Sequence, residues 1–185
     1  MQPSIFIWLV YTFWLALGAY LAVAAIGMRQ DAGAHIWQRI VPSLPIILAF
    51  LLPRLPILHF LNFRSINPVQ GVAGLVLCAA GMLFLVWGRQ YLGRNWSQVV
   101  TDKKGHELVT SGPYRYVRHP VYAGALLACI GSAIAAGGPW ILFLVVMGSL
   151  FFWRVGAEDK LMEQLFPSEY PNYKKRTKAL IPFIW

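Results

Sequence analysis

The chain has 185 residues, of which 58% are hydrophobic and only 12% are charged, and its formal net charge is +9. A soluble domain of this length has too little interior for so much apolar surface, so the composition excludes a soluble globular protein and indicates that most of the chain lies in lipid. Twelve of the 16 Lys and Arg residues lie from Arg89 onward, in two segments beside apolar runs. This is typical of cytoplasmic loops at a membrane surface, so nucleic acid is not expected as a partner.

Three apolar runs fill the N-terminal half, and each predicts a membrane segment. Residues 4–28 lack a basic leader and are too long for a signal peptide, so they predict a retained span. Residues 40–61 contain four prolines and Arg54, which leaves two interpretations open, a bent helix or a re-entrant element. Residues 68–87 predict a closely packed central helix, because small residues lie along them: Gly71, Ala73, Gly74, Ala80 and Gly81.

The C-terminal half begins with a polar, basic interval, residues 88–119. Two apolar runs follow, residues 121–136 and 140–153, and the short uncharged connection between them predicts a tight antiparallel helical hairpin. The tail after residue 153 is expected to contain a separate amphipathic helix over residues 158–166, which Pro167 ends.

These elements predict an all-α, polytopic membrane protein with about five transmembrane helices. Residues 1–87 form an N-terminal region of three spans, and residues 88–185 form a C-terminal region with the hairpin and a cytoplasmic cofactor-binding tail. The basic segments place the C-terminus in the cytoplasm and, counting back through the spans, the N-terminus outside.

The entrance to the hairpin carries the most distinctive polar residues. Pro120 suits the first turn of a helix and biases His119 toward an extended conformation. Arg118 and His119 are thereby held at a helix start, where free N–H groups and a bidentate guanidinium favour a carboxylate. The other interpretation is that Arg and Tyr residues here are ordinary interfacial anchors.

Glu158 and Asp159 follow the hairpin on its cytoplasmic side, so we expect them to lie close to Arg118 and His119. A cationic cofactor that carries its own carboxylate would fit between the two sets of charges, and S-adenosylmethionine has that charge pattern. Alternatively, Glu158 and Asp159 form a structural ion network with Arg154, with Lys160 or with the opposite polar segment.

Other chemistries lack their groups in this sequence. Cys78 and Cys129 form no metal-spaced pair, the four His residues are scattered, and no HExxH, GxSxG or strand-linked GxGxxG motif is present. A metal site, a hydrolase and a soluble dinucleotide-binding site are therefore not expected.

Two groups of residues, spread over about residues 89–183, resemble the integral-membrane isoprenylcysteine carboxyl methyltransferase family. The first group comprises Leu92–Ser97, Gly105–Arg115 and Arg118–Gly124. The second comprises Glu158, Asp159, Phe166, Tyr170, Tyr173 and Pro182. Asp159 stands where the family usually has a second Glu, and Pro167 where it usually has Gly. The first difference puts one polar contact in doubt, and the second affects a turn.

The resemblance implies a membrane methyltransferase, as in a prokaryotic inner membrane, that uses S-adenosylmethionine and releases S-adenosylhomocysteine. It places Arg118 and Glu158 in catalysis, with Arg118 orienting the acceptor. It also implies a set of residues around the cofactor: Leu108, Val109, Tyr114, His119, Tyr122, Gly124, Glu158 and Asp159.

The expected reaction is carboxyl O-methylation of a lipophilic, isoprenylcysteine-like substrate that enters from the membrane lipids. A phospholipid-amine N-methyltransferase, a membrane NADPH-dependent reductase and a non-catalytic membrane scaffold remain as alternatives. The sequence leaves the acceptor molecule and the oligomeric state open.

Overall fold

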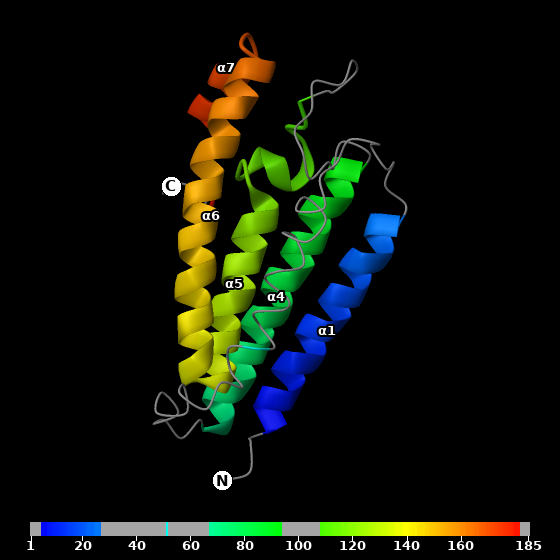
Figure 1. The fold of residues 1–185 in the computed structure, drawn as a ribbon, viewed down its shortest axis with the longest axis vertical. Coiled ribbons are helices and arrows are strands. Elements are labelled where there is room, and N and C mark those ends of the chain that lie inside the picture. The colour runs from blue at the N-terminus through cyan, green and yellow to red at the C-terminus, as the bar shows by residue number, and fades with distance from the viewer. Residues whose placement is uncertain (1–4, 27–50, 52–66, 94–107, 182–185) are drawn as a thin grey trace.

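A computed structural model describes residues 5–26, 51, 67–93 and 108–181 of the chain (Figure 1). Its helices are α1 (Ile5–Ile26), α4 (Pro68–Leu92), the 3-10 helix η5 (Gly112–Arg115), α5 (Pro120–Ala136), α6 (Gly138–Leu165) and α7 (Tyr170–Arg176). Within these ranges the only β pairing is an isolated bridge between Val117 and Lys178. The predicted all-α class is therefore confirmed for the described residues.

Three helices, α1, α4 and α6, are long and apolar enough to cross a membrane. At about 1.5 Å per residue they match or exceed the ~30 Å hydrocarbon core of a bilayer. Helix α5 has 17 residues and is shorter. Of the roughly five expected spans, the described residues thus show three full-length candidates and one short apolar helix. The predicted segment 40–61 lies outside the described residues, apart from Leu51.

Two predicted boundaries differ from the structure. Helix α6 does not end near Trp153, because it runs without a break to Leu165 and includes the expected amphipathic segment. An Arg154–Glu158 pair spaced i,i+4 supports the helix across this point. Helix α4 likewise continues to Leu92, past the expected boundary at residue 87, and its buried Arg89 donates to the backbone carbonyl of Ala24 at 3.2 Å.

The helices α4 and α5 pack against each other along glycines. A Cβ atom added at Gly81 would lie 2.4 Å from the backbone nitrogen of Ala128, and one added at Gly131 would lie 2.3 Å from that of Cys78. Only glycine permits this approach, so the predicted close packing of this helix is confirmed. Ala73 and Ala80 are exposed instead, so the small-residue contact is narrower than expected.

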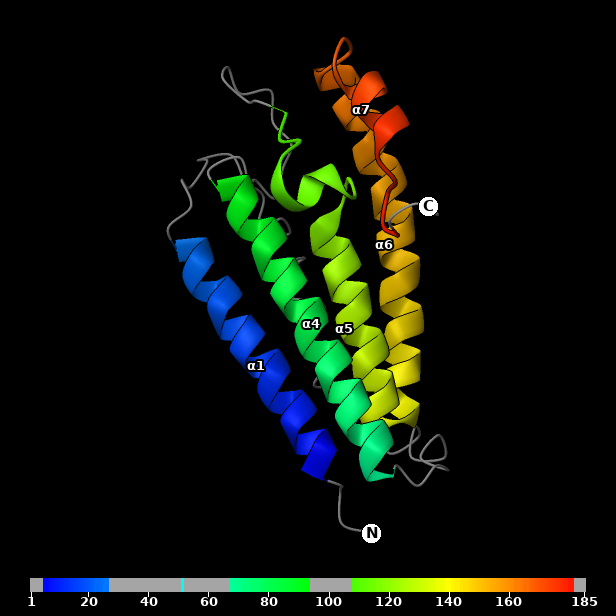
Figure 2. The same ribbon diagram turned by 180° about the vertical axis from the view of Figure 1, so that it is seen from behind.

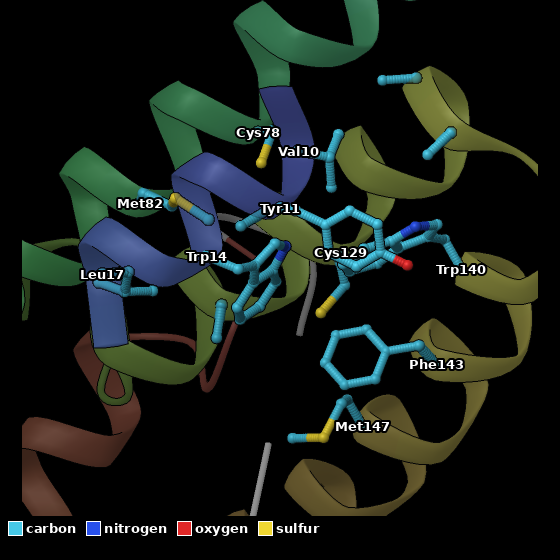
Figure 3. Packing of buried hydrophobic residues seen from close by; sticks show 14 of the residues in the cluster. Val10, Tyr11, Trp14, Leu17, Cys78, Met82, Cys129, Trp140, Phe143 and Met147 are labelled. Carbon is cyan, nitrogen blue, oxygen red and sulfur yellow. The ribbon is translucent and has the colours of Figure 1, made fainter. Parts of the chain in front are cut away.

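Aromatic residues join α1 to the hairpin, as Figure 3 shows. The ring of Trp14 lies 5.3 Å from that of Phe143 and 6.1 Å from that of Trp140. Its indole N–H donates to the hydroxyl of Ser132 at 3.0 Å, which satisfies a polar group that is otherwise buried. These contacts hold α1, α5 and α6 together at one level of the bundle.

The hairpin forms as predicted, with α5 and α6 antiparallel and side by side in both views (Figures 1 and 2). Gly137 alone separates them, and its φ of 79° is a left-handed conformation that favours glycine. At the other end α5 begins below the ends of α4 and α6, and residues 108–119 and α7 lie around this start (Figures 1 and 2). The polar residues of both hairpin ends therefore meet at one end of the bundle.

Candidate active site

The start of α5 is held by the chain that follows α7. The backbone N–H groups of Arg118 and His119 donate to the carbonyls of Lys178 and Ala179 at 2.8 and 3.0 Å. Helix α5 then begins at Pro120, as predicted, with His119 as its N-cap at φ −123° and ψ 64°. Two segments about 60 residues apart in sequence thus fix the backbone at the site.

Asp159 is the buried centre of the polar cluster. Its carboxylate accepts hydrogen bonds from Arg118 Nη2 at 2.9 Å and from the hydroxyl of Tyr170 at 2.5 Å. It also lies 2.7 Å from His119 Nε2. These partners come from α7 and the α5 start, and Asp159 itself lies on α6, so it ties all three elements together.

Glu158 has a more open environment. One of its oxygens accepts from the hydroxyl of Tyr122 at 2.5 Å and from Arg154 Nε at 2.9 Å. The other lies 3.5 Å from His119 Nδ1. The side chain of Glu158 is 26% exposed, against 9% for Asp159, so Glu158 is the carboxylate that a ligand can reach more easily.

His119 lies between the two carboxylates, with one ring nitrogen facing each. Burial lowers its pKa, but the hydrogen bonds to Asp159 and Glu158 outweigh burial, and the net effect raises the pKa above its ordinary value. Burial and the bond to Asp159 also raise the pKa of Tyr170, which keeps its hydroxyl protonated as a donor. The two carboxylates therefore favour the protonated form of the imidazole between them.

The guanidinium of Arg118 is almost fully used by the protein. Besides both oxygens of Asp159, at 2.9 and 3.4 Å, it donates to the backbone carbonyls of Thr177 at 2.5 Å and Lys174 at 3.3 Å. These carbonyls end α7, where a cation is favourable. Arg118 thus fastens the end of α7 to α6.

The structure brings together five of the predicted site residues: Arg118, His119, Tyr122, Glu158 and Asp159. It places Gly124 elsewhere, because a Cβ added there would meet the backbone of Gly81 and Leu85 on α4. Tyr114 is buried and its carbonyl accepts from Tyr173, whereas Leu108 and Val109 are half-buried residues before η5.

The contact of Arg154 with Glu158 was expected in the alternative interpretation as an ion network, whereas sequence reasoning missed the contact of Thr177. The i,i+4 spacing of Arg154 and Glu158 was a signal for the first. No local signal marked the carbonyl of Thr177, because its contact with Arg118 depends on how the tail folds back.

The set of side chains suits a small ligand that carries both signs of charge. The exposed side of Glu158 matches an ammonium or hydroxyl group, and a ligand carboxylate would share the ring N–H groups of His119 with Asp159 and Glu158. The ring of Tyr122 stacks on Phe151 at 4.9 Å and on His119 at 5.8 Å, so an aromatic group that could attract a further cation lies beside the charged residues. The chemistry of these residues therefore fits S-adenosylmethionine. Among the described residues there is no group of three side chains placed to hold a metal ion.

Comparison with known proteins gives consistent results. Residues 69–169 match the family model described as phospholipid methyltransferase. A protein-S-isoprenylcysteine O-methyltransferase of Saccharomyces cerevisiae is 30% identical over 140 residues, which cover 74% of this chain and 57% of the relative. The enzymes of the same name from Schizosaccharomyces pombe and Rattus norvegicus are 34% and 33% identical, over 50% and 58% of this chain. The matches cover 41% and 42% of those two proteins, so the chain spans about half the length of these relatives.

One solved structure has a similar fold. It is titled as the eukaryotic intramembrane Ras methyltransferase ICMT (isoprenylcysteine carboxyl methyltransferase) without a monobody. The TM-score is 0.61 with 22% sequence identity, over 95% of this chain and 67% of that one. At this identity the likeness supports the membrane fold.

Proposed function

The chain belongs to the phospholipid methyltransferase family, and from this premise we propose that it transfers a methyl group from S-adenosylmethionine to the carboxylate of a lipophilic, isoprenylcysteine-like acceptor. The family resemblance seen in the sequence motifs is confirmed by the relatives, which are named as isoprenylcysteine methyltransferases. The observation that carries the proposal is the single cluster that joins His119, Tyr122 and Glu158 where α5 and α6 meet.

In this proposal the residues around the cofactor have separate tasks. The cofactor's carboxylate lies near His119, whose ring nitrogens also face Asp159 and Glu158, and Glu158 accepts from the cofactor's ammonium or ribose hydroxyls. Tyr122 presents its ring toward the positive sulfur, and the backbone of Leu108 and Val109 lies near the adenine. Asp159 keeps His119 and Arg118 in position through its own hydrogen bonds.

Methylation of a carboxylate does not require the protein to remove a proton. The cofactor carries the methyl group on its sulfonium. A carboxylate oxygen can accept this methyl group without first losing a proton, and S-adenosylhomocysteine is released. Alignment of the two reactants can contribute about 7–11 kcal/mol to lowering the barrier. A buried site at the membrane edge also limits the hydration of the acceptor carboxylate.

A second candidate is N-methylation of an amine-bearing phospholipid, because the matching family model is described as phospholipid methyltransferase. An amine acceptor must lose a proton during the reaction, and Glu158, 26% exposed, is the carboxylate available to take it. The two candidates therefore differ in whether the reaction requires a base.

The test is transfer of a labelled methyl group by the purified protein in detergent to three acceptors: a prenylcysteine analogue, a fatty acid and an aminophospholipid. We expect label on the prenylcysteine carboxylate. Label on the aminophospholipid alone would favour the second candidate.

Calorimetry with S-adenosylhomocysteine and NADPH separates a transferase from a reductase, and Glu158→Ala is expected to weaken S-adenosylhomocysteine binding. Absence of binding by either ligand would contradict both enzyme assignments and favour a scaffold.

A further inference from the structure

Arg154 lies on α6 one turn from Glu158, toward the middle of the helix. Its Nε donates to Glu158 at 2.9 Å, and its side chain is 37% exposed. Within the described part of the chain this guanidinium hydrogen-bonds Glu158 through Nε, and since a guanidinium has five N–H donors, its Nη groups can meet another acceptor.

Arg118 offers much less to an incoming anion. Its side chain is 9% exposed, and its guanidinium already donates to Asp159 and to two backbone carbonyls. A substrate carboxylate would have to displace these bonds, which leaves buried acceptors without donors. Binding of the acceptor carboxylate therefore breaks fewer existing hydrogen bonds at Arg154 than at Arg118.

The surroundings of Arg154 change from apolar to polar along α6. Leu150, Arg154 and Glu158 follow one another at i,i+4 spacing, so they lie along one face of the helix at steps of about 6 Å. Leu150 is 48% exposed, and it lies toward the apolar end of the row. The row thus presents an apolar contact, then a cation, then the carboxylate proposed to hold the cofactor.

Resting on the proposed function, we propose that Arg154, rather than Arg118, binds the carboxylate of the methyl acceptor. The acceptor class that fits is an anionic amphiphile whose carboxylate lies next to an apolar tail. The tail lies along α6 beside Leu150, and the carboxylate meets the Nη groups of Arg154 next to the cofactor site. Arg118 is then a positioning residue that fastens the end of α7 to Asp159.

A structural role for Arg154, limited to orienting Glu158, makes a different prediction. Loss of such a role would weaken cofactor binding, because Glu158 is the proposed cofactor contact. Loss of an acceptor contact would weaken acceptor binding and remove selectivity for a negative charge. The two roles are therefore separated by measuring both ligands.

The experiment compares wild type with Arg154→Gln and with the matched control Arg176→Gln, which changes an exposed arginine at the end of α7. Competition assays measure the affinity for a prenylcysteine carboxylate and for its uncharged carboxamide. We expect wild type and the control to prefer the carboxylate, and Arg154→Gln to lose that preference with a rise in acceptor KM of about 10- to 100-fold. The dissociation constant of S-adenosylhomocysteine should change less than about threefold.

An unchanged preference for the carboxylate in Arg154→Gln would overturn the proposal, as would weaker S-adenosylhomocysteine binding without a loss of preference. If Arg154→Gln does not fold, Arg154→Lys takes its place. It keeps the charge but loses the planar fork, so a several-fold smaller preference is expected, and an unchanged one overturns the proposal. Failure of the proposed function is distinct, because wild type itself would then methylate no carboxylate.

Discussion

Two adjacent carboxylates, Glu158 and Asp159, have different environments at the candidate site. The short arm of Asp159 is surrounded by Arg118, His119 and Tyr170, so it serves the protein's own structure. Glu158 keeps part of its surface open. Asp159, which stands where the family usually has a second Glu, is therefore the carboxylate that lies inside the protein's own hydrogen-bond network.

The charge of His119 predicts how stability depends on pH. Its pKa is raised on folding, so the stabilisation is fully present below the unfolded value of about 6.5 and is lost as the pH rises through the higher folded value. We expect the unfolding temperature of the ligand-free protein to fall over this window, relative to that of His119→Gln. Thermal unfolding in detergent from pH 5.5 to 9 measures this difference.

The groups that face His119 determine this behaviour: Glu158 and Asp159 from α6, and Tyr122 from α5. Both carboxylates favour the protonated ring. A constant difference between wild type and His119→Gln across the pH range would show that folding does not shift the pKa of His119, and would contradict this prediction.

At the scale of single elements, the contact between α4 and α5 decides where the α5 start lies. Gly81 and Gly124 bring the two backbones together without side chains between them. Since Arg118 and His119 come directly before α5, a displacement of α5 would move them relative to α6. Packing in the middle of the bundle thus affects the site at its end.

We predict that Gly124→Ala destabilises the protein by about 1–3 kcal/mol, because its Cβ would lie 2.5 Å from the backbone nitrogen of Leu85. The control is Gly156→Ala on α6, where a Cβ meets no atom within 4 Å and alanine favours the helix. Chemical unfolding in detergent compares the two. Equal stability of both variants would contradict the close packing of α4 on α5.

At the scale of the whole molecule, the polar site lies at one end of the bundle and the Gly137 turn at the other (Figures 1 and 2). We propose that the site end faces the cytoplasm, because the exposed basic residues Lys174, Lys175 and Arg176 lie on α7 at that end. The proposed acceptor can then reach the site from the inner leaflet.

Single-cysteine labelling tests this orientation. In intact cells a membrane-impermeant maleimide is expected to label Val69→Cys, at the exposed start of α4, and to leave Lys175→Cys unlabelled until the cells are lysed. The native Cys78 and Cys129 are buried, so their background should be low. Labelling of Lys175→Cys before lysis would reverse the proposed orientation.

The sequence by itself determined the all-α membrane class, the α5 start at Pro120, the hairpin turn and the residues that identify the family. These follow from apolar run length, proline geometry and local motifs, which depend on residues close together in the chain. The predicted closeness of Arg118 and His119 to Glu158 and Asp159 also followed, because both ends of one hairpin must meet.

Only the tertiary structure decided which neighbours the residues of the site contact. Arg118 pairs with Asp159 and the end of α7, Gly124 faces α4, and the side chain of Arg154 stays partly exposed. Each outcome depends on the rotation of a helix about its own axis and on where the tail folds back. Periodicity in a sequence shows which residues share a face, but contacts between distant segments decide which neighbour that face meets.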